Sequence, residues 1–435
     1  MKKLIGILLA IVLTVAMFAS CAVAEEEQMV ITMLTSIARP DEHPTAFSYS
    51  FWTLVDNYEE RTGVKIEWEN YPDQSAYQEK LYTLAAAGDL PDLYRMKGSW
   101  MTEFVDNDWI VDITADMDDE FTSIFQAGMF DNHSKDGKIY AVPDENMTTG
   151  VVFYNSALWK EAGYDSFPTD WDTLIEAAAK FEAMGIPMFV LGNKANWPAE
   201  SCWYSSLADH GTGTEWTHNI LAKDGSASYT DEGVVTALAK FQQLAQTPGA
   251  MNVDINSIDE TEARQVFMNG KAATLVEGTW YVSELESVNP DIIDDVELAI
   301  LPSWDGAVGN PNAVSGGPAW GMSLSPKATE SDEKYAACMD FLKCVYGLEM
   351  GSQALEMGGI MAISTDFDDS NLGPIMVKYL DMMADKTTVP IWDACMEAGV
   401  INTFNVGLQE VLIGTKTPEE LAEETQMEYE MALLG

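Results

Sequence analysis

The sequence predicts an α/β fold in which parallel strands are covered by helices. Strand patterns at residues 30–35, 64–68 and 91–94 alternate with helix patterns at 47–58 and 77–85. A strand–helix–strand order needs a crossover, and such crossovers give parallel strands with helices on the faces. The chain has 435 residues and is 47% apolar. This length and composition suit packed cores in two lobes or in one large unit.

Local signals support each of these first elements. The apolar run at 30–35 is typical of a buried strand. Apolar residues then recur at helical spacing, and Gly63 follows where glycine commonly ends a helix. Val64, Ile66 and Trp68 alternate with charged residues, which predicts a second strand. The next helix should stop at Gly88.

The alternation of strands and helices continues along the chain. Further strands are expected at 138–142, 151–154, 188–191, 271–277, 296–301 and 320–324. Helices are expected after a cap at Thr169 or Asp170, after a cap at Thr230 and at 260–268. From about residue 331 the pattern is nearly all helical, and Thr417-Pro418-Glu419-Glu420 is typical of a helix start. We find no flexible linker, so two lobes would be joined by short crossings.

The net charge excludes several classes of partner. The chain carries 70 acidic and 23 basic residues, for a formal charge of −47. A nucleic-acid-binding protein needs a basic surface, and the sequence has none. An anionic membrane surface would also repel this chain.

Residues 1–24 have the pattern of an export signal. Lys2 and Lys3 precede an uncharged, mostly apolar stretch that is too short for a comfortable bilayer span of about 20 residues. Two cleavage sites remain open. Ala22-Val23-Ala24 suits an ordinary signal peptidase, whereas Phe18-Ala19-Ser20-Cys21 resembles a lipobox, with Phe18 where Leu is usual. We expect an exported protein that is either secreted or anchored through a lipid on Cys21 to the outer face of the cell membrane.

Motifs for catalysis and metal binding are missing from the sequence. The four histidines do not stand at H-E-x-x-H spacing, and there is no G-x-S-x-G elbow or Walker phosphate loop. With 70 acidic residues, pairs of carboxylates carry no signal for glycoside cleavage. We therefore expect no enzyme activity, no cofactor and no metal.

Aromatic residues are the strongest candidates for a binding site. Flat indole faces cover the apolar face of a sugar ring, while polar side chains satisfy its hydroxyl rim. Four of the 13 tryptophans lie in loops with Gly or Pro nearby: Trp197, Trp280, Trp304 and Trp320. Trp197 and Trp280 follow strands, and ligands of open α/β sheets bind beyond the carboxyl ends of strands. For each one, packing in a core remains the alternative.

Six short motifs in order give a family resemblance. They are Gly88-Asp89-Leu90-Pro91-Asp92-Leu93, the D-G-K-x-Y-x-x-P stretch at 136–143, the Y-N-x-x-L stretch at 154–158, the P-x-x-W-x-x-L stretch at 168–174, the N-G-K-A-A and G-T-W stretches at 269–280, and the T-P-E-E stretch at 417–420. Asp170 departs from the family pattern, where Thr is usual. With these motifs the chain resembles the extracellular solute-binding proteins, family 1, of bacterial ABC importers.

This resemblance implies a two-lobed periplasmic-binding-protein type II fold, also called a Venus flytrap. Each lobe would hold a mixed or parallel sheet flanked by helices. By analogy, lobe 1 would span 28–142 plus 300–346, and lobe 2 would span 143–299 plus 347–435 with the C-terminal helices. The lobes would close around a ligand by a hinge motion.

The resemblance also implies a function. The protein would bind a sugar or oligosaccharide in the cleft between the lobes and deliver it to the permease subunits of the importer, most simply as a monomer. Trp280 would be the stacking platform. Further residues expected to line the cleft are the loop at 36–45, Asp92, Glu145, Trp392 and Asp393.

Two other functions stay open at this point. Aromatic walls and acidic residues would also suit a polyamine, or the cargo could be a peptide. A secreted glycoside hydrolase would use similar residues, although the resemblance over nearly the whole chain argues against it.

Overall fold

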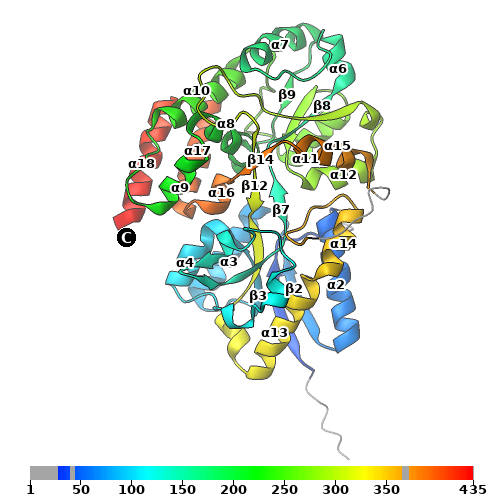
Figure 1. Ribbon diagram of the computed structural model, residues 1–435, viewed down its shortest axis with the longest axis vertical. Coiled ribbons are helices and arrows are strands. Elements are labelled where there is room, and N and C mark those ends of the chain that lie inside the picture. The colour runs from blue at the N-terminus through cyan, green and yellow to red at the C-terminus, as the bar shows by residue number, and fades with distance from the viewer. Residues whose placement is uncertain (1–27, 40–44, 365–371, 435) are drawn as a thin grey trace, which may run out of the picture.

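The computed structural model describes residues 28–39, 45–364 and 372–434, which form two lobes stacked end to end (Figure 1). The expected export signal and Cys21 lie outside the described residues. Within the three described ranges, no helix combines the length and the apolar character needed to cross a bilayer. The predicted α/β class and the two-lobed arrangement are confirmed.

Lobe 1 is built on a five-stranded sheet with the order β2-β1-β3-β13-β6. Its strands are β1 (Val30–Thr35), β2 (Lys65–Asn70), β3 (Leu93–Lys97), β6 (Ala141–Pro143) and β13 (Trp320–Leu324). The predicted parallel pairing is confirmed for β1 with β2 and for β1 with β3. β13 runs antiparallel to β3, so its first residue lies at the same edge as the last residue of β3.

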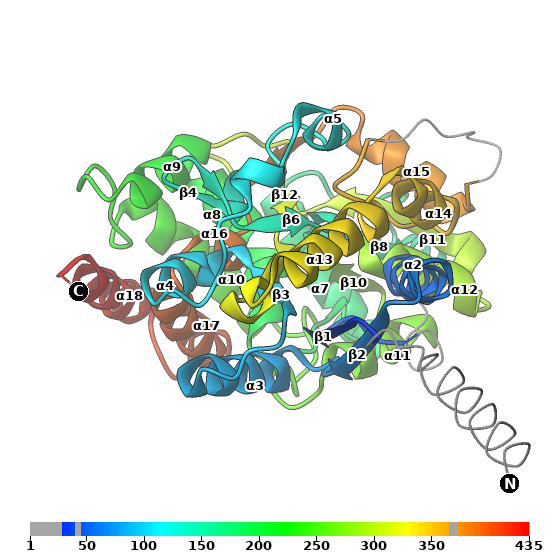
Figure 2. The same ribbon diagram turned by 90° about the horizontal axis from the view of Figure 1, so that it is seen from below.

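Helices cover both faces of the lobe 1 sheet. They are α2 (Ala46–Thr62), α3 (Gln74–Ala87), α4 (Met101–Asp106), α5 (Asp119–Thr122), α13 (Asp332–Val345) and α14 (Leu348–Glu356). α2 and α13 lie on one face, and α3 lies on the other (Figure 2). Gly63 and Gly88 end α2 and α3 in left-handed conformations, as predicted. Short 3-10 turns and one two-stranded ribbon complete the lobe: η1 (Gly98–Trp100), η2 (Thr114–Asp116), η3 (Asp131–His133), η6 (Pro326–Thr329), β4 (Ser134–Lys135) and β5 (Lys138–Ile139).

Lobe 2 is built on a four-stranded sheet with the order β11-β8-β10-β9. Its strands are β8 (Val151–Asn155), β9 (Phe189–Val190), β10 (Thr274–Glu277) and β11 (Val296–Ile300). β8 pairs antiparallel with β10 and β11, while β9 and β10 are parallel. The sheet is therefore mixed, in agreement with the fold class that the resemblance implies.

The helices of lobe 2 surround this sheet. They are α6 (Ser156–Glu161), α7 (Trp171–Met184), the π-helical turn η4 (Ala199–Tyr204), α8 (Ser205–Thr212), α9 (Thr214–Ala222), α10 (Glu232–Gln246), α11 (Glu260–Met268), α12 (Trp280–Val288), the short turn η5 (Ile293–Asp295), α15 (Pro374–Met383), α16 (Trp392–Cys395), α17 (Ala398–Leu412) and α18 (Pro418–Leu434). Asp170 caps α7, as predicted, through a hydrogen bond from the Thr173 amide. The expected cap at Thr230 is wrong, because Asp231 occupies the N-cap of α10.

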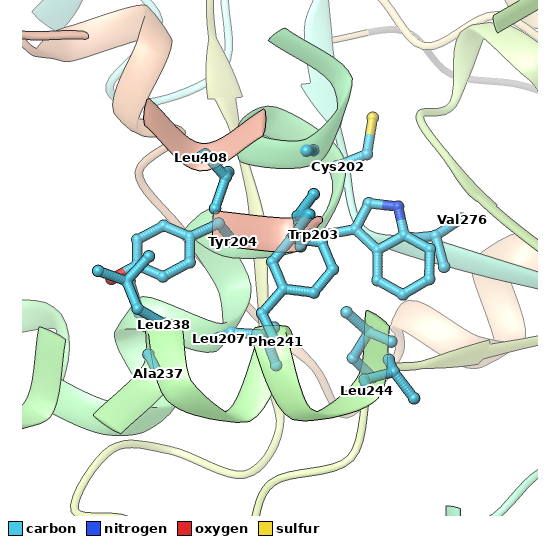
Figure 3. Packing of buried hydrophobic residues seen from close by; sticks show 14 of the residues in the cluster. Cys202, Trp203, Tyr204, Leu207, Ala237, Leu238, Phe241, Leu244, Val276 and Leu408 are labelled. Atoms are coloured by element: carbon cyan, nitrogen blue, oxygen red, sulfur yellow. The ribbon is translucent and has the colours of Figure 1, made fainter. Parts of the chain in front are cut away.

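The core of lobe 2 packs around η4 (Figure 3). Trp203 of this turn stacks on Phe241 of α10, with ring centroids 5.4 Å apart and planes 12° from parallel. The Tyr204 hydroxyl donates a 3.0 Å hydrogen bond to the Val234 carbonyl. The stacked rings of Trp203 and Phe241 and the buried hydrogen bond of Tyr204 together fix η4 against α10.

A three-stranded sheet joins the lobes. It consists of β7 (Asn146–Thr148), β12 (Ala313–Pro318) and β14 (Thr387–Val389), with β12 in the middle. β7 and β12 run between the lobes (Figure 1). Gly317 has φ 132°, a conformation that other residues rarely adopt, so this position of the crossing favours glycine.

The expected lobe limits differ from the structure at two places. We expected lobe 2 to end at 299 and lobe 1 to resume at 300, but β11 extends the lobe 2 sheet one residue further, to Ile300. We also expected residues after 346 in lobe 2, but α14 packs on α2, with Met350 and Ala354 in the same apolar cluster as Phe51. We therefore propose that lobe 1 comprises 30–143 plus 320–363, and that lobe 2 comprises 151–312 plus 374–434.

We predict that Gly211→Ala destabilises lobe 2 by about 1–3 kcal/mol. α8 and α10 approach so closely that a Cβ at Gly211 would lie 2.4 Å from the Gly233 carbonyl oxygen. Urea unfolding of the variant measures the loss. Gly399→Ala is the matched control, because its Cβ would meet only the flexible Glu428 carboxylate, at 3.2 Å. Equal stability of the two variants would contradict the close packing of α8 on α10.

Candidate functional site

A cavity of about 560 Å³ lies between the lobes and is lined by both. Lobe 1 and the crossing contribute Ser36, Ile37, Ala38, Thr45, Phe47, Ser48, Pro72, Asp73, Gln74, Arg95, Lys97, Glu145, Met147 and Trp320, and lobe 2 contributes Ala195, Trp197, Ser201, Asp259, Glu260, Thr261, Arg264, Trp280, Glu284, Val288 and Asp393. We call this cavity the cleft. Its size is within the usual range for small-molecule sites.

The topology explains why these residues meet. The carboxyl ends of β1, β2 and β3 form one edge of the lobe 1 sheet because the three strands are parallel. Lys97 ends β3 at this edge, and Trp320 lies opposite it because β13 is antiparallel and starts there. The first residue of a strand can therefore reach the cleft as well as the last one.

The structure brings five of the eight predicted residues to the cleft. They are Trp197, Trp280, Trp320, Glu145 and Asp393. The predicted loop at 36–45 also contributes Ser36, Ile37, Ala38 and Thr45, while residues 40–44 lie outside the described residues.

Asp92 is not a cleft residue. It precedes β3 and so lies at the opposite end of the strand from Lys97, fully buried. Its carboxylate accepts hydrogen bonds from the Thr32 amide and hydroxyl, both at 2.7 Å, and pairs with Lys334 at 2.8 Å. The side chain holds lobe 1 together at the far edge of the sheet.

Trp304 and Trp392 also lie away from the cleft. Trp304 packs edge-on against Trp171 on lobe 2. Trp392 is buried in the lobe 2 core, where it stacks on Trp216 with centroids 5.1 Å apart. On the short helix α16, Trp392 and Asp393 point in different directions, so only Asp393 reaches the cleft.

Trp197 and Trp280 form the aromatic wall on the lobe 2 side. Their ring centroids are 5.9 Å apart, and the planes are inclined by 65°. The Trp280 indole N–H donates a 2.9 Å hydrogen bond to the Glu277 carboxylate at the end of β10. This bond fixes the orientation of the Trp280 indole. The side chains of Trp197 and Trp280 are both partly exposed.

Trp320 lines the cleft differently, because two cations lie over its ring. The Arg95 guanidinium is 4.6 Å and the Lys97 ammonium 5.5 Å from the ring centroid. The side chain is only 6% exposed. Little of its face is therefore free for a ligand.

Arg95 is held by a buried cluster at the crossing. Its Nε donates to Asp144 at 2.7 Å, Nη2 donates to Glu145 at 3.2 Å, and Nη1 donates to Ser36 at 3.1 Å. Burial, together with the charge of Asp144, raises the pKa of Glu145 to about 8. The Asp144 carboxylate and the Glu145 carboxyl group thus share one guanidinium.

Lys97 connects lobe 1 to α16. Its ammonium donates to Asp393 at 2.6 Å, and both side chains are 5% exposed. Glu200 of η4 lies nearby, and burial, together with the charge of Asp393, raises its pKa well above the usual range. A buried pair of this kind is costly to break, because removal of one partner leaves the other charge unpaired.

Arg264 is the third cation of the cleft. It pairs with Glu284 at 2.8 Å, with Glu277 at 3.0 Å and with Glu260 at 3.3 Å. Glu277 therefore bridges Arg264 and the Trp280 indole.

The prediction from sequence missed all three cations. One signal was available for two of them, since Arg95 and Lys97 occupy alternate positions in the buried strand β3. Charged residues at alternate positions of such a strand point to one face and need partners there. Arg264 sits on α11, close in sequence to the acidic residues 259, 260 and 262, and nothing in the sequence distinguishes it.

A second pocket, of about 660 Å³, lies on lobe 2 beside α15. No tryptophan lines it, and lobe 1 contributes no residue. The cleft has indole faces next to carboxylates from two lobes, which is the chemistry that binds a hydroxyl-rich ligand. Within the described part of the chain, no group of His, Cys, Asp and Glu side chains could hold a metal ion.

Comparison with known families gives one match over most of the chain. The family described as "Bacterial extracellular solute-binding protein" matches residues 53–378.

Curated relatives are distant in sequence. Two binding proteins of Brucella abortus are 26% identical over 233 residues, and the chain spans 55% of their length. A protein of Deinococcus radiodurans named "Probable ABC transporter-binding protein" is 25% identical over 73% of this chain and 74% of its own. The arabinooligosaccharide-binding protein of Bacillus subtilis is 23% identical over 67% of this chain and 64% of its own.

Solved structures share the fold. A chitin oligosaccharide binding protein superposes with a TM-score of 0.84 and 22% identity, covering 94% of this chain and all of the other. A maltose-bound MalE3 of T. maritima has a TM-score of 0.75 and 22% identity over 93% of this chain and all of its own. At this identity the likeness establishes the two-lobed fold.

We predict that ionisation of Glu145 lowers stability as the pH rises from about 4.5 to about 8. The folded protein retains a proton in this range that the unfolded chain has released, so unfolding becomes easier with each pH unit. The groups that face Glu145 are Asp144, Arg95 and the Tyr346 phenol. In Glu145→Gln the fall should be shallower by up to about 1.4 kcal/mol per pH unit.

Urea unfolding at several pH values between 5 and 8 measures these slopes. Glu176→Gln, which removes an exposed carboxylate on α7, should leave the slope unchanged. Identical slopes for the wild type and Glu145→Gln would show that Glu145 titrates as an ordinary surface carboxyl.

Proposed function

The chain belongs to the bacterial extracellular solute-binding proteins, and on this basis we propose that it is the binding subunit of an ABC importer for a sugar or oligosaccharide. The ligand binds in the cleft, and the loaded protein delivers it to the permease subunits. No chemical step is part of this function.

One observation carries the proposal of a carbohydrate ligand. The partly exposed indoles of Trp197 and Trp280 form a wall of a 560 Å³ cavity whose other lining residues include many carboxylates. An indole face covers the C–H face of a sugar ring, and carboxylate oxygens accept hydrogen bonds from its hydroxyl groups. The names of the Bacillus relative and of the chitin oligosaccharide binding protein support the same class of ligand.

The arrangement of the lobes supports a hinge-type binding cycle. β7 and β12 pass between the lobes beside the cleft, and ligand that touches both lobes favours the closed form. The two cleavage sites in the export signal lead to a secreted protein or to one anchored through Cys21. In both forms the protein works outside the cytoplasm as a monomer.

A second candidate is a cationic solute such as a polyamine. The observation that favours it is the excess of carboxylates in the cleft, where six acidic residues stand against three basic ones. Titration with spermidine alongside saccharides separates the two candidates.

We predict that a saccharide ligand changes the tryptophan fluorescence of the purified mature chain in a saturable way. Trp280→Ala should weaken binding at least tenfold, about 1.4 kcal/mol, because the indole face that covers the sugar is lost. Calorimetric titration with a broad glycan panel measures both affinities.

Trp304→Ala is the matched control, because this indole packs against Trp171 outside the cleft and its loss should leave the affinity unchanged. Binding that Trp304→Ala abolishes and Trp280→Ala preserves would refute the assignment of the cleft. The absence of a response to every glycan, together with saturable binding of spermidine, would favour the second candidate. Product release from an oligosaccharide would indicate a hydrolase.

A further inference from the structure

Among the residues that line the cleft, acidic side chains outnumber basic ones, and those that pair with an arginine are more exposed than that arginine. Six acidic residues and three basic residues line the cavity: Asp73, Glu145, Asp259, Glu260, Glu284 and Asp393, and Arg95, Lys97 and Arg264. The Arg264 side chain is 9% exposed beside the Glu284 carboxylate at 19%. Arg95, at 8%, lies beside Glu145, at 14%, which retains its proton up to about pH 8. A ligand entering the cleft therefore meets acidic groups first.

The two guanidinium groups have little capacity left for a ligand. Arg264 is held at Nε by Glu277, at Nη1 by Glu284 and at Nη2 by Glu260. Arg95 donates from Nε to Asp144, from Nη2 to Glu145 and from Nη1 to the Ser36 hydroxyl. Recognition of a carboxylate by arginine uses two parallel N–H groups, and three of the five N–H groups of each guanidinium are already bonded within the protein. The two side chains are only 8% and 9% exposed, so little of either guanidinium faces a ligand.

Lys97 is closed off by a different contact. Its ammonium is paired with Asp393 and lies over the Trp320 ring, and its side chain is only 5% exposed. Asp73 and Asp259 accept hydrogen bonds from the Ala76 and Glu262 amides at the starts of α3 and α11, so neither needs a cation from the cleft.

We propose that the cleft selects its saccharide by charge, so that neutral and amine-bearing saccharides bind and saccharides with carboxylate or sulfate groups are rejected. Glu284 and Glu260 are the specificity-determining residues, because they occupy the Arg264 nitrogens that an acidic sugar would need. The inference rests on the proposed function and specifies its substrate class. Like charges brought together in a partly desolvated site oppose binding, which is a common source of specificity.

The first experiment compares matched saccharides on the purified mature chain by calorimetric titration at constant ionic strength. The pairs are xylo-oligosaccharides with and without a glucuronate branch, and the N-acetylglucosamine trimer with the glucosamine trimer. We expect the glucuronate-bearing form to bind at least tenfold more weakly than the neutral form, and the amine form to bind at least as tightly as its neutral partner. A glucuronate-bearing form that binds as tightly as the neutral form would overturn the proposal.

The second experiment tests the two residues directly. In Glu284→Gln and Glu260→Gln one Arg264 nitrogen loses its carboxylate partner, so discrimination against the acidic form should fall at least fivefold. Both side chains are partly exposed, Glu284 at 19% and Glu260 at 31%, so we expect both variants to fold. Thermal unfolding checks that each one does. Glu176→Gln removes the same charge on α7 and should keep the full discrimination. Unchanged discrimination in both cleft variants would contradict the assignment of these residues.

A third measurement does not depend on saccharide affinity. Sodium glucuronate should not raise the melting temperature of the wild type above the value in glucose with sodium chloride, but it should do so in Glu284→Gln. If no saccharide binds the wild type and this pattern holds, the carbohydrate function fails, while the exclusion of carboxylates by Glu284 stands. Stabilisation of the wild type by glucuronate, or none in Glu284→Gln, would overturn the charge selection.

Discussion

The pairing of three buried cations with carboxylates determines the architecture of the cleft. A charge removed from water without a partner is costly, so Arg95, Lys97 and Arg264 must lie where acidic groups surround them. The same acids and cations orient the aromatic side chains. Glu277 holds Arg264 and the Trp280 indole together, while Arg95 and Lys97 cover the face of Trp320. The indole surface that a ligand meets is thus a consequence of charge neutralisation.

Local patterns in the sequence predicted the elements well where a cap or an alternation defined them. Gly63, Gly88 and Asp170 each end or begin a helix as expected, because their conformational role depends on near neighbours only. The limits of the lobes were less predictable. α14 lies on lobe 1 because its apolar face fits α2, which is about 300 residues earlier in the chain, and no local signal reports such a contact.

The residues of the candidate site were also predictable only where local sequence places them. Trp197 and Trp280 could be placed at the ends of strands by rules that need only the chain order. The partner of Lys97 could not be found, because Asp393 lies 296 residues away in the sequence. Asp92 and Glu145 were both predicted to line the cleft. Asp92, however, precedes β3 and lies at the end of this strand away from the cleft, because only the carboxyl end of β3, at Lys97, meets the cleft.

The position of β13 has a consequence for how the protein matures. This strand lies between β3 and β6 in the lobe 1 sheet, but it is synthesised after most of lobe 2. A nascent chain therefore lacks an inner strand of its first sheet until residue 324 has left the ribosome. Such a chain stays open for longer during translation, because the first sheet cannot be completed before β13 is available.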